Sequence, residues 1–555
     1  MNRKTPGKIK AACVLIIIAA TFGAYAMTIG HGFAYDDHEL ILNNRWITDF
    51  RYLPQAFTSS LWSFKGMVSN TYRPVLHLVF TAEYRLFGQN PSGYHFISVA
   101  LHAVNALVVF LISSFFISER DQVKPGSLRG HARVFRFPVK RGGNRWLPPL
   151  FAGLIFSLHP INSEVVSWVS AITELTYTLF LLLSFYFYIR FRAGEGRAFY
   201  QLSVLSFPLA LFSKETAVML PMLIAAYDLS GGGASFIRRW KGYLPYILVI
   251  ILYMALRTAS VGGLLHHKQI SLSGYELLVN IFPLIFKYAW KLVLPIGLNA
   301  IYVMEYAASL WEPKAIAGVS VSALFLASVL LSLRKRPVFI CLVIIALPLL
   351  PVLYIPALSN AAFAERYLYL PSAGFAILIS YGFDALLNRT DNRKTRMAVT
   401  ALLALALALY SIGSVKRSLV WKDDFTLWQD TVEKSPSSKY AHYNLALAYR
   451  DRGDTGGAIG HLSEAVRLDG SYEDAHYNLG WVYDYSGDYD KAIAHYREAI
   501  RLNPDSADAY FNIGMIYKKK GLYNEAAQEL KEALKIRPDY GEAKRELDGI
   551  GGGRL

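Results

Sequence analysis

The chain has 555 residues, of which 54% are hydrophobic, and its mean hydropathy of +0.28 is too high for an ordinary soluble protein of this size. The formal net charge of +16 is unevenly distributed, since residues 1–420 carry 39 basic and 18 acidic groups, whereas the residues from Trp421 onward carry 18 and 23. The basic excess lies mostly in short stretches between apolar runs, which favours cytoplasmic membrane loops and argues against nucleic-acid binding. Cys13 and Cys341 both lie in apolar runs, so disulfides and cysteine metal sites are not expected.

The first predicted element is a membrane span from Ala11 to about Ile29, because this apolar run is long enough to cross a bilayer and follows four basic residues. Ala24-Tyr25-Ala26 also fits a signal-peptidase site, but the run is long for a signal sequence, so we expect an uncleaved span. Further spans are expected at about 97–117, 147–166, 172–189, 199–213, 216–230, 243–257, 315–333, 337–356, 367–386 and 397–414. The sequence therefore predicts an all-α polytopic membrane bundle of about 11 spans.

The loops between the predicted spans alternate in charge. Five loops rich in arginine and lysine fall on one side: Arg120–Arg145, Arg190–Arg197, Arg238–Lys241, Arg334–Arg336 and Arg389–Arg396. The positive-inside rule places these loops and the N-terminus in the cytoplasm. The apolar segment 279–295 contains Lys287 and Lys291, so we expect it to be re-entrant or interfacial. The C-terminal region then lies outside the cytoplasm of a multi-pass plasma-membrane protein, or of an inner-membrane protein if the source is bacterial.

The longest predicted outer loop of the membrane domain, residues 30–95, carries Asp36 and Asp37 directly after the first span. Two adjacent carboxylates at a membrane surface are costly unless they are solvated or paired. A carboxylate held near the lipid headgroups with a suitable pKa can take a proton from an incoming hydroxyl group. The alternative for an isolated Asp-Asp pair is an ordinary solvated turn. The residues alone therefore make Asp36 and Asp37 candidates for catalysis without deciding between the two interpretations.

Other predicted outer loops also hold charged or polar groups. His159 and Glu164 lie in one outer corner, and Lys214 and Glu215 lie at a tight turn between two apolar runs. Such groups at a membrane are functional candidates by default. His159, which precedes a proline, also fits a helix cap, and Lys214 with Glu215 also fits a self-contained ion pair. We therefore rank these four residues as secondary site candidates.

The last quarter of the chain repeats every 34 residues. Four sets of residues keep this step: Asn444, Asn478 and Asn512; Gly453, Gly487 and Gly521; Ala458, Ala492 and Ala526; and Ala465, Ala499 and Ala533. Small residues at fixed offsets of this period are typical of tetratricopeptide repeats (TPRs), which are pairs of antiparallel helices with Ala or Gly at the crossing. We expect repeats at about 439–472, 473–506 and 507–540, within a TPR α-solenoid domain from 419 to 555 that follows a membrane domain from 1 to 418.

The three asparagines Asn444, Asn478 and Asn512 occupy one register on the first helices, which is the face that lines the groove of such an array. A ladder of amide groups can pair with the C=O and N–H groups of an extended peptide. This pattern predicts a peptide-binding surface. The alternative is that asparagine is common at this register in repeats without a peptide role, since a repeat fold does not imply a function.

Several short motifs resemble known enzymes. Asp36-Asp37 resembles the paired acidic motif in the first outer loop of membrane glycosyltransferases of the GT-C superfamily, and Tyr72-Arg73-Pro74 with the stretch Gly93–His102 is similar to the segment before their second span. Further motifs resemble one branch, the transmembrane and TPR O-mannosyltransferases, whose arrays face the lumen: Leu158–Glu164, Ser213–Thr216 and Glu365–Pro371. The motifs occur in the expected order along the whole chain.

This resemblance implies transfer of a sugar, mannose or a similar hexose, from a polyprenyl-phosphate donor to a Ser or Thr hydroxyl of a protein recruited by the TPRs. Asp36 or Asp37 would be the base, and we favour Asp36. Arg73 and Arg366 would bind the donor phosphate, because a guanidinium group donates two parallel hydrogen bonds. Either arginine also fits a headgroup anchor. Glu365, which precedes Arg366, is a further secondary candidate.

Two other functions remain open from the sequence: a non-catalytic membrane scaffold that gathers partners through its repeats, and a ligase or polymerase of cell-envelope glycans. No phosphate-binding loop or dinucleotide glycine pattern is present, which favours a lipid-linked donor. His266-His267 lacks a third ligand, so no metal site is predicted, although two neighbouring aspartates could hold a divalent ion. The expected partners are a lipid-linked sugar, a protein acceptor and membrane lipid, without nucleic acid.

Overall fold

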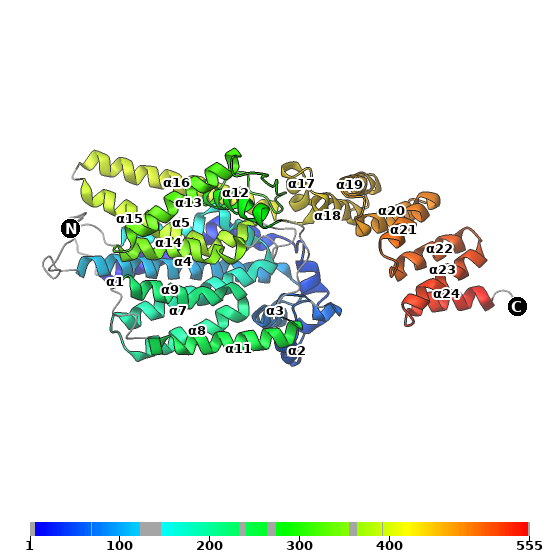
Figure 1. Cartoon of the computed structure of the whole chain (residues 1–555), viewed down its shortest axis with the longest axis horizontal. Helices are drawn as coiled ribbons and strands as arrows, with labels where there is room; N and C mark the ends of the chain where they lie inside the picture. Colours follow the sequence, from blue (N-terminus) through cyan, green and yellow to red (C-terminus); the bar gives the residue numbers. More distant parts are fainter. Residues whose placement is uncertain are drawn as a thin grey trace. The chain divides into compact units, whose positions relative to one another are not determined.

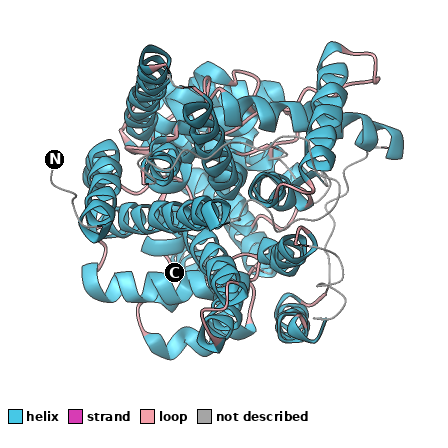
Figure 2. Cartoon of the chain, turned by 90° about the vertical axis from the view of Figure 1, so that its left-hand side faces the viewer, coloured by secondary structure: helices cyan, strands magenta, loops and turns pink. Residues whose placement is uncertain are grey.

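The computed structural model describes residues 6–67, 69–122, 146–231, 240–263, 273–353, 363–390 and 392–552. These residues form helices joined by loops, with no strand among them (Figure 2). The chain divides into two compact units: Met1–Ala300 with Met304–Asp423, and Asp424–Leu555 with Ile301–Val303. The predicted all-α class is confirmed.

The first unit is a bundle of helices (Figure 1). Its helices pack around a large apolar core. Its α-helices are α1 (Pro6–Tyr25), α2 (Leu53–Thr58), α3 (Pro74–Phe87), α4 (Pro91–Gln122), α5 (Leu147–Leu158), α6 (Ser163–Ser167), α7 (Ile172–Arg192), α8 (Arg197–Ser213), α9 (Leu220–Leu229), α11 (Leu244–Val261), α12 (Gly274–Val293), α13 (Pro313–Ser332), α14 (Arg336–Ala346), α15 (Tyr369–Arg389) and α16 (Arg393–Val420). Several of them, including α3, α5 and α11, carry proline in the first turn, where its missing N–H is not needed.

Eight helices among the described residues are long and apolar enough to cross a membrane, or nine if the bent pair Leu147–Leu158 and Pro160–Ser167 forms one span. The two other predicted spans, 199–213 and 216–230, are largely helical and correspond to α8 and α9. These helices have 17 and 10 residues and are too short to count among the helices that could cross a membrane. The polytopic bundle is therefore confirmed, and the count of about 11 stays a prediction. Helix α12 is not among the eight, so its expected non-spanning position also stays a prediction.

Glycines bring several helix pairs of the bundle close together. A Cβ atom on Gly318 of α13 would lie 2.0 Å from the main-chain oxygen of Phe282 in α12, and one on Gly374 of α15 would lie 2.7 Å from the main-chain oxygen of Cys341 in α14. Small residues at such crossings are typical of membrane helices, because van der Waals contact replaces the hydrophobic effect there. Of the eight candidate spans, the one that contains α7 is the most enclosed, with 78% of its most apolar stretch buried. The residues at the start of α7 therefore have little access to solvent.

The second unit is the repeat array. It contains α17 (Asp424–Lys434), α18 (Lys439–Asp451), α19 (Thr455–Leu468), α20 (Glu473–Tyr485), α21 (Tyr489–Leu502), α22 (Ala507–Lys519), α23 (Tyr523–Ile536) and α24 (Gly541–Gly552). Gly453, Gly487 and Gly521 have φ values of +78°, +83° and +75°, which glycine adopts without strain in the turn between paired helices. The alanines of the repeat pattern are fully buried at the helix crossings. Figure 1 shows α18 to α23 as three successive helix pairs followed by α24, which confirms the predicted TPRs.

Candidate active site

The loop with the two aspartates lies between η1 (Ala26–Gly30) and a single turn of π-helix, η2 (His38–Leu42). Tyr35 in this loop has φ = +58°, a left-handed conformation that is costly for a residue with a side chain. Its ring packs against Trp168, with ring centroids 5.7 Å apart. Strained residues and π-turns cluster at functional sites. These features argue against an ordinary solvated turn.

Asp37 is held rigidly. Its side chain is buried, and its carboxylate accepts hydrogen bonds from the main-chain N–H of Ala34 at 3.1 Å and from the N–H and hydroxyl of Ser170 at 2.8 and 2.5 Å. Ser170 lies in η7 (Val169–Ala171), directly before α7. Burial raises the pKa of Asp37 to about 7, although the hydrogen bonds from Ser170 and Ala34 oppose this change. Asp37 therefore acts as an anchor for the loop.

Asp36 is only half-buried, and among the described residues its carboxyl group accepts none of the hydrogen bonds that hold Asp37. Burial raises its pKa to about 6, and the positive charge of Arg366 works in the opposite direction. The structure thus brings together two predicted site residues that are far apart in sequence. A carboxyl group that titrates near neutral pH and is accessible is suited to accept a proton.

Arg366 lies in η13 (Glu365–Leu368), just before the main part of α15, and is oriented by Glu164. Its Nη1 donates to Glu164 Oε1 at 2.6 Å, and its main-chain N–H donates to Oε2 at 3.1 Å. The guanidinium group also lies over the ring of Trp168, 5.5 Å from the centroid. In the described structure Glu164 occupies one of the five guanidinium N–H groups, so Arg366 retains donors for an anion. Glu164 is therefore part of the site as a positioning residue.

Arg73, directly before α3, pairs with Glu215, the first residue of η8 (Glu215–Met219), with Nη2 and Oε1 3.3 Å apart. Burial tends to raise the pKa of Glu215, but the charge of Arg73 holds that pKa below its usual range. The ion pair between Lys214 and Glu215 that the sequence allowed is not formed. Lys214 instead pairs with Glu174 in the first turn of α7.

The Lys214–Glu174 ion pair is enclosed, with only 6% and 5% of the two side chains exposed. The ammonium group lies 5.0 Å from the centroid of the Tyr367 ring, and a small pocket lies between these residues, Tyr177 and Thr216. Glu174 and Ser170 are not among the site residues expected from the sequence. A signal for Glu174 was present, since an ionisable residue within an apolar span is a functional candidate by default.

Lys214→Met is expected to destabilise the protein by about 3–5 kcal/mol, because it leaves the carboxylate of Glu174 buried without its cation. The thermal midpoint of unfolding of the purified protein in detergent measures this loss. The double variant Lys214→Met/Glu174→Gln removes both charges and is expected to recover most of the stability. A double variant no more stable than Lys214→Met would show that the lost stability does not come from an unpaired Glu174 carboxylate.

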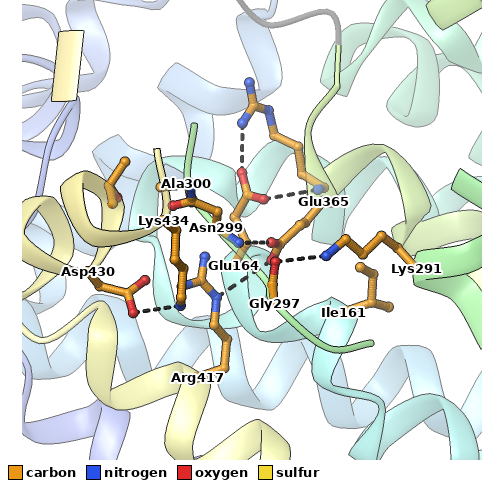
Figure 3. Close-up of polar contacts among 12 residues, drawn as sticks. Ile161, Glu164, Lys291, Gly297, Asn299, Ala300, Glu365, Arg417, Asp430 and Lys434 are labelled. Carbon is orange, nitrogen blue, oxygen red and sulfur yellow. Dashed lines mark hydrogen bonds and ion pairs between the residues drawn. The ribbon is translucent and has the colours of Figure 1, made fainter. Parts of the chain in front are cut away.

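Two secondary candidates have structural roles. His159 Nδ1 accepts from the main-chain N–H of Ile161 at 3.2 Å and so caps η6 (Pro160–Asn162), while its Nε2–H donates to the main-chain oxygen of Leu292 at 3.0 Å. The cap interpretation therefore fits His159. Glu365 is fully buried, accepts from the main-chain N–H of Asn299 and pairs with Arg417, 3.6 Å away (Figure 3). Glu365 ties α16 to the chain after α12.

The side chains of the three repeat asparagines form hydrogen bonds within the array. Asn444 Nδ2 donates to the main-chain oxygen of Tyr440 at 2.7 Å. Asn478 and Asn512 donate to the hydroxyl groups of Tyr443 and Tyr477 in the preceding repeats, at 3.2 and 3.0 Å. A bound peptide would have to replace these hydrogen bonds, so peptide binding through this ladder stays a prediction.

The described residues contain no group of three or more His, Cys, Asp or Glu side chains placed to hold a metal ion. Within that part of the chain, Asp36 and Asp37 therefore have no further acidic or imidazole ligands around them. Three predicted features lie outside the described residues: His266-His267, residues 356–362 before the Glu365–Pro371 motif, and most of the basic segment Arg120–Arg145.

Comparison with known proteins supports both parts of the chain. The models described as TPR repeat and tetratricopeptide repeat match residues 446–484 and 485–521, and 507–540, respectively. Protein O-mannosyl-transferase F38B6.6 of Caenorhabditis elegans is 27% identical over 469 residues, which cover 83% of this chain and 63% of the relative. Human protein O-mannosyl-transferases TMTC4 and TMTC3 are 25% and 21% identical and cover 80% and 82% of this chain.

The chain resembles protein O-mannosyl-transferases. The resemblance inferred from the motifs and repeats is thereby confirmed, and the similarity covers the membrane unit as well as the array. The chain spans 63%, 65% and 51% of the lengths of these three relatives. Among solved structures, the crystal structure of MamA is 29% identical and covers 29% of this chain and 88% of its own, with a TM-score of 0.20.

Proposed function

We propose that the chain is a membrane-embedded glycosyltransferase that transfers mannose, or a similar hexose, from a polyprenyl-phosphate donor to Ser or Thr hydroxyl groups of proteins outside the cytoplasm. The observation that carries this proposal is the half-buried Asp36 beside Arg366, in a chain similar to enzymes named protein O-mannosyl-transferases. These names support the sugar and the protein acceptor. A lipid-linked donor accounts for an active site built between apolar helices, because the lipid tail must stay in the bilayer.

The residues of the site have separate roles in the proposed reaction. The Asp36 carboxylate takes the hydroxyl proton as the acceptor oxygen bonds to the anomeric carbon. The bond between that carbon and the phosphate oxygen breaks, and the polyprenyl phosphate leaves with the bonding electrons. Arg366 and Arg73 stabilise the charge that develops on the phosphate. Glu164 and Glu215 orient the two guanidinium groups, and the TPR array recruits the acceptor protein.

The direct test uses the purified full-length chain, a set of labelled sugar donors and a panel of Ser- and Thr-containing peptides. Transfer from polyprenyl-phosphate mannose to peptide, without transfer from nucleotide sugars, is the expected result. A product on glycan or lipid would favour the envelope ligase, and no transfer from any donor would favour the scaffold. Peptide mapping of the product identifies the acceptor residue.

The transfer rate is expected to rise with pH and to reach half of its maximum near pH 6. The reason is that Asp36 must be ionised to act as a base, and burial raises its pKa to about 6. Below pH 6, kcat/KM should fall about tenfold for each pH unit. Initial rates between pH 4.5 and 8.5 measure this profile. A rate that is independent of pH below 6 would exclude a base with this pKa.

The stability of the folded protein, unlike the transfer rate, should fall as the pH rises over part of this range. The pKa of Asp37 in the folded protein, about 7, is raised above its value in the unfolded chain. The stabilisation from protonated Asp37 is therefore fully present at low pH and is lost as the pH rises through about 7. The thermal midpoint of Asp37→Asn should lack this pH-dependent component.

The predicted orientation is tested by cysteine labelling of intact cells or oriented vesicles. Single cysteines placed at exposed Met67 of the outer loop and at exposed Tyr485 of the array should react with an impermeant reagent from outside, whereas one at Lys335 should react only after permeabilisation. The native Cys13 and Cys341 are buried and provide a low background. Labelling of position 67 from the cytoplasmic side would exclude the proposed mechanism.

A further inference from the structure

Two repeats of the array contain a pair of facing histidines at the contact between their two helices. His442 on α18 faces His461 on α19 with Nδ1 atoms 3.0 Å apart, and His476 on α20 faces His495 on α21 with Nδ1 atoms 3.2 Å apart. The ring centroids are 5.2 and 5.4 Å apart, and both pairs have an interplanar angle of 36°. The same geometry therefore recurs at the 34-residue step.

The hydrogen bonds of the first pair show where its lone pairs point. His442 Nε2 lies 3.0 Å from the main-chain oxygen of Pro436, which can only accept, so Nε2 carries the proton. Nδ1 of neutral His442 then presents its lone pair to Nδ1 of His461. Either His461 donates a proton to it, or both lone pairs bind one cation. A His–Zn²⁺ bond of about 2.0–2.1 Å and a ligand angle of about 90–110° place two nitrogens about 2.9–3.4 Å apart, and both observed distances fall in this range.

The surroundings of the pairs resemble the supporting shell of a metal site. The Tyr449 ring stacks on His461 with centroids 5.4 Å apart, and the Tyr483 ring stacks on His495 with centroids 5.6 Å apart. The carbonyl of Pro436 orients His442 in the way that outer partners commonly orient metal-binding histidines. His442 and His476 are each 7% exposed, so the two sites are shielded from bulk water on one side.

Each pair also has a carboxylate one helical turn away. Glu464 follows His461 by three residues, and Glu498 follows His495 by three. In the structure these carboxylates bind Arg467 and Arg501, whose side chains are 69% and 65% exposed. Such exposed ion pairs contribute little to stability, so either glutamate can turn to the imidazoles at small cost.

The third repeat serves as an internal comparison. The positions equivalent to the two histidines hold Tyr510 and Glu529, and Glu529 pairs with Arg497 of the preceding repeat. Packing of the helix pair therefore does not require imidazoles at these positions. The recurrence of two histidines in two successive repeats therefore points to a role that depends on the imidazole groups.

We propose that each histidine pair binds one divalent transition-metal ion such as Zn²⁺ through its two Nδ1 atoms, with Glu464 or Glu498 as the third ligand. Imidazole nitrogen is a preferred ligand of Zn²⁺, Cu²⁺ and Ni²⁺, and two imidazoles with one carboxylate form a known zinc ligand set. The ion links the first helix of a repeat to its second helix. Metal binding therefore stabilises the part of the array nearest to the membrane unit in sequence.

The test uses the full-length chain in detergent, purified without a histidine tag and stripped with a chelator. Zinc titration should show two ions per chain, one for His461→Asn and none for His461→Asn/His495→Asn. Asparagine can still donate a hydrogen bond across the helix contact, so these variants should stay folded. Saturating zinc should raise the thermal midpoint of the wild type by several degrees and leave the double variant unchanged. Tyr510→Phe, at the equivalent position of the third repeat, is the matched control with two ions.

The proposed role of Glu464 and Glu498 as metal ligands is tested separately. Glu464→Gln/Glu498→Gln should keep the two-ion stoichiometry and weaken the affinity about tenfold or more, because the imidazoles remain but the anionic ligand is lost. An unchanged affinity would remove the glutamates from the ligand set. Absence of zinc binding by the wild type at micromolar concentrations, or equal binding by the double histidine variant, would overturn the proposal and leave the pairs as imidazole hydrogen bonds only.

Discussion

Asp36→Asn is expected to lower the rate of sugar transfer by about 10²–10⁴-fold while the protein remains folded. The amide has nearly the shape of the carboxyl group but cannot accept the hydroxyl proton. Asp36 is half-buried and does not share the hydrogen bonds that anchor Asp37, so its replacement leaves the loop in place. Single-turnover transfer to a peptide with saturating donor measures the chemical step, and thermal unfolding in detergent verifies the fold.

Two variants in the same loop separate catalysis from general damage. Glu39→Gln is the matched control, because Glu39 is a nearby carboxylate, in the adjacent turn η2, that pairs with Lys65 at 2.5 Å and is 38% exposed. It should retain nearly full activity. Asp37→Asn has only one acceptor oxygen, so it loses either the hydrogen bond from Ala34 or those from Ser170, and it should reduce activity together with stability. Full activity of Asp36→Asn with complete inactivity of Asp37→Asn at unchanged stability would assign the base to Asp37 instead.

Arg366→Gln is expected to lower kcat by about 10²–10³-fold, because the departing phosphate loses a cation that is already oriented by Glu164. The substitution also leaves Glu164, whose side chain is 1% exposed, without its charged partner, so stability should fall as well. Steady-state kinetics with polyprenyl-phosphate sugar, together with the thermal midpoint, report the two effects. Arg366→Lys keeps the charge but not the planar fork and should lie between the wild type and Arg366→Gln.

The double variant Arg366→Gln/Glu164→Gln distinguishes the two roles of the arginine. Removal of both charges should restore most of the stability but not the transfer rate. Arg85→Gln is a suitable control, since Arg85 pairs with Asp49 at 3.6 Å and is 53% exposed. A double variant that regained activity along with stability would show that Arg366 only supports the fold.

The amino-acid sequence by itself determined the features that depend on local pattern. Long apolar runs specify membrane helices because backbone groups in lipid must be satisfied within the segment. The 34-residue period of Gly453, Gly487 and Gly521 specifies helix pairs, since only glycine adopts the positive φ of their turns without strain. The Asp36-Asp37 motif could be singled out by its place after the first span and by its resemblance to other enzymes.

Only the tertiary structure decided which charges face one another. Arg366 and Glu164 are about 200 residues apart in sequence, and Lys214 pairs with Glu174 rather than with its neighbour Glu215. Likewise, Asp36 and Asp37 differ because Ser170 reaches only Asp37, and His159 and Glu365 serve the fold because their partners come from distant helices. The physical reason is that an ion pair depends on distance and burial in three dimensions, which periodicity along one helix does not determine.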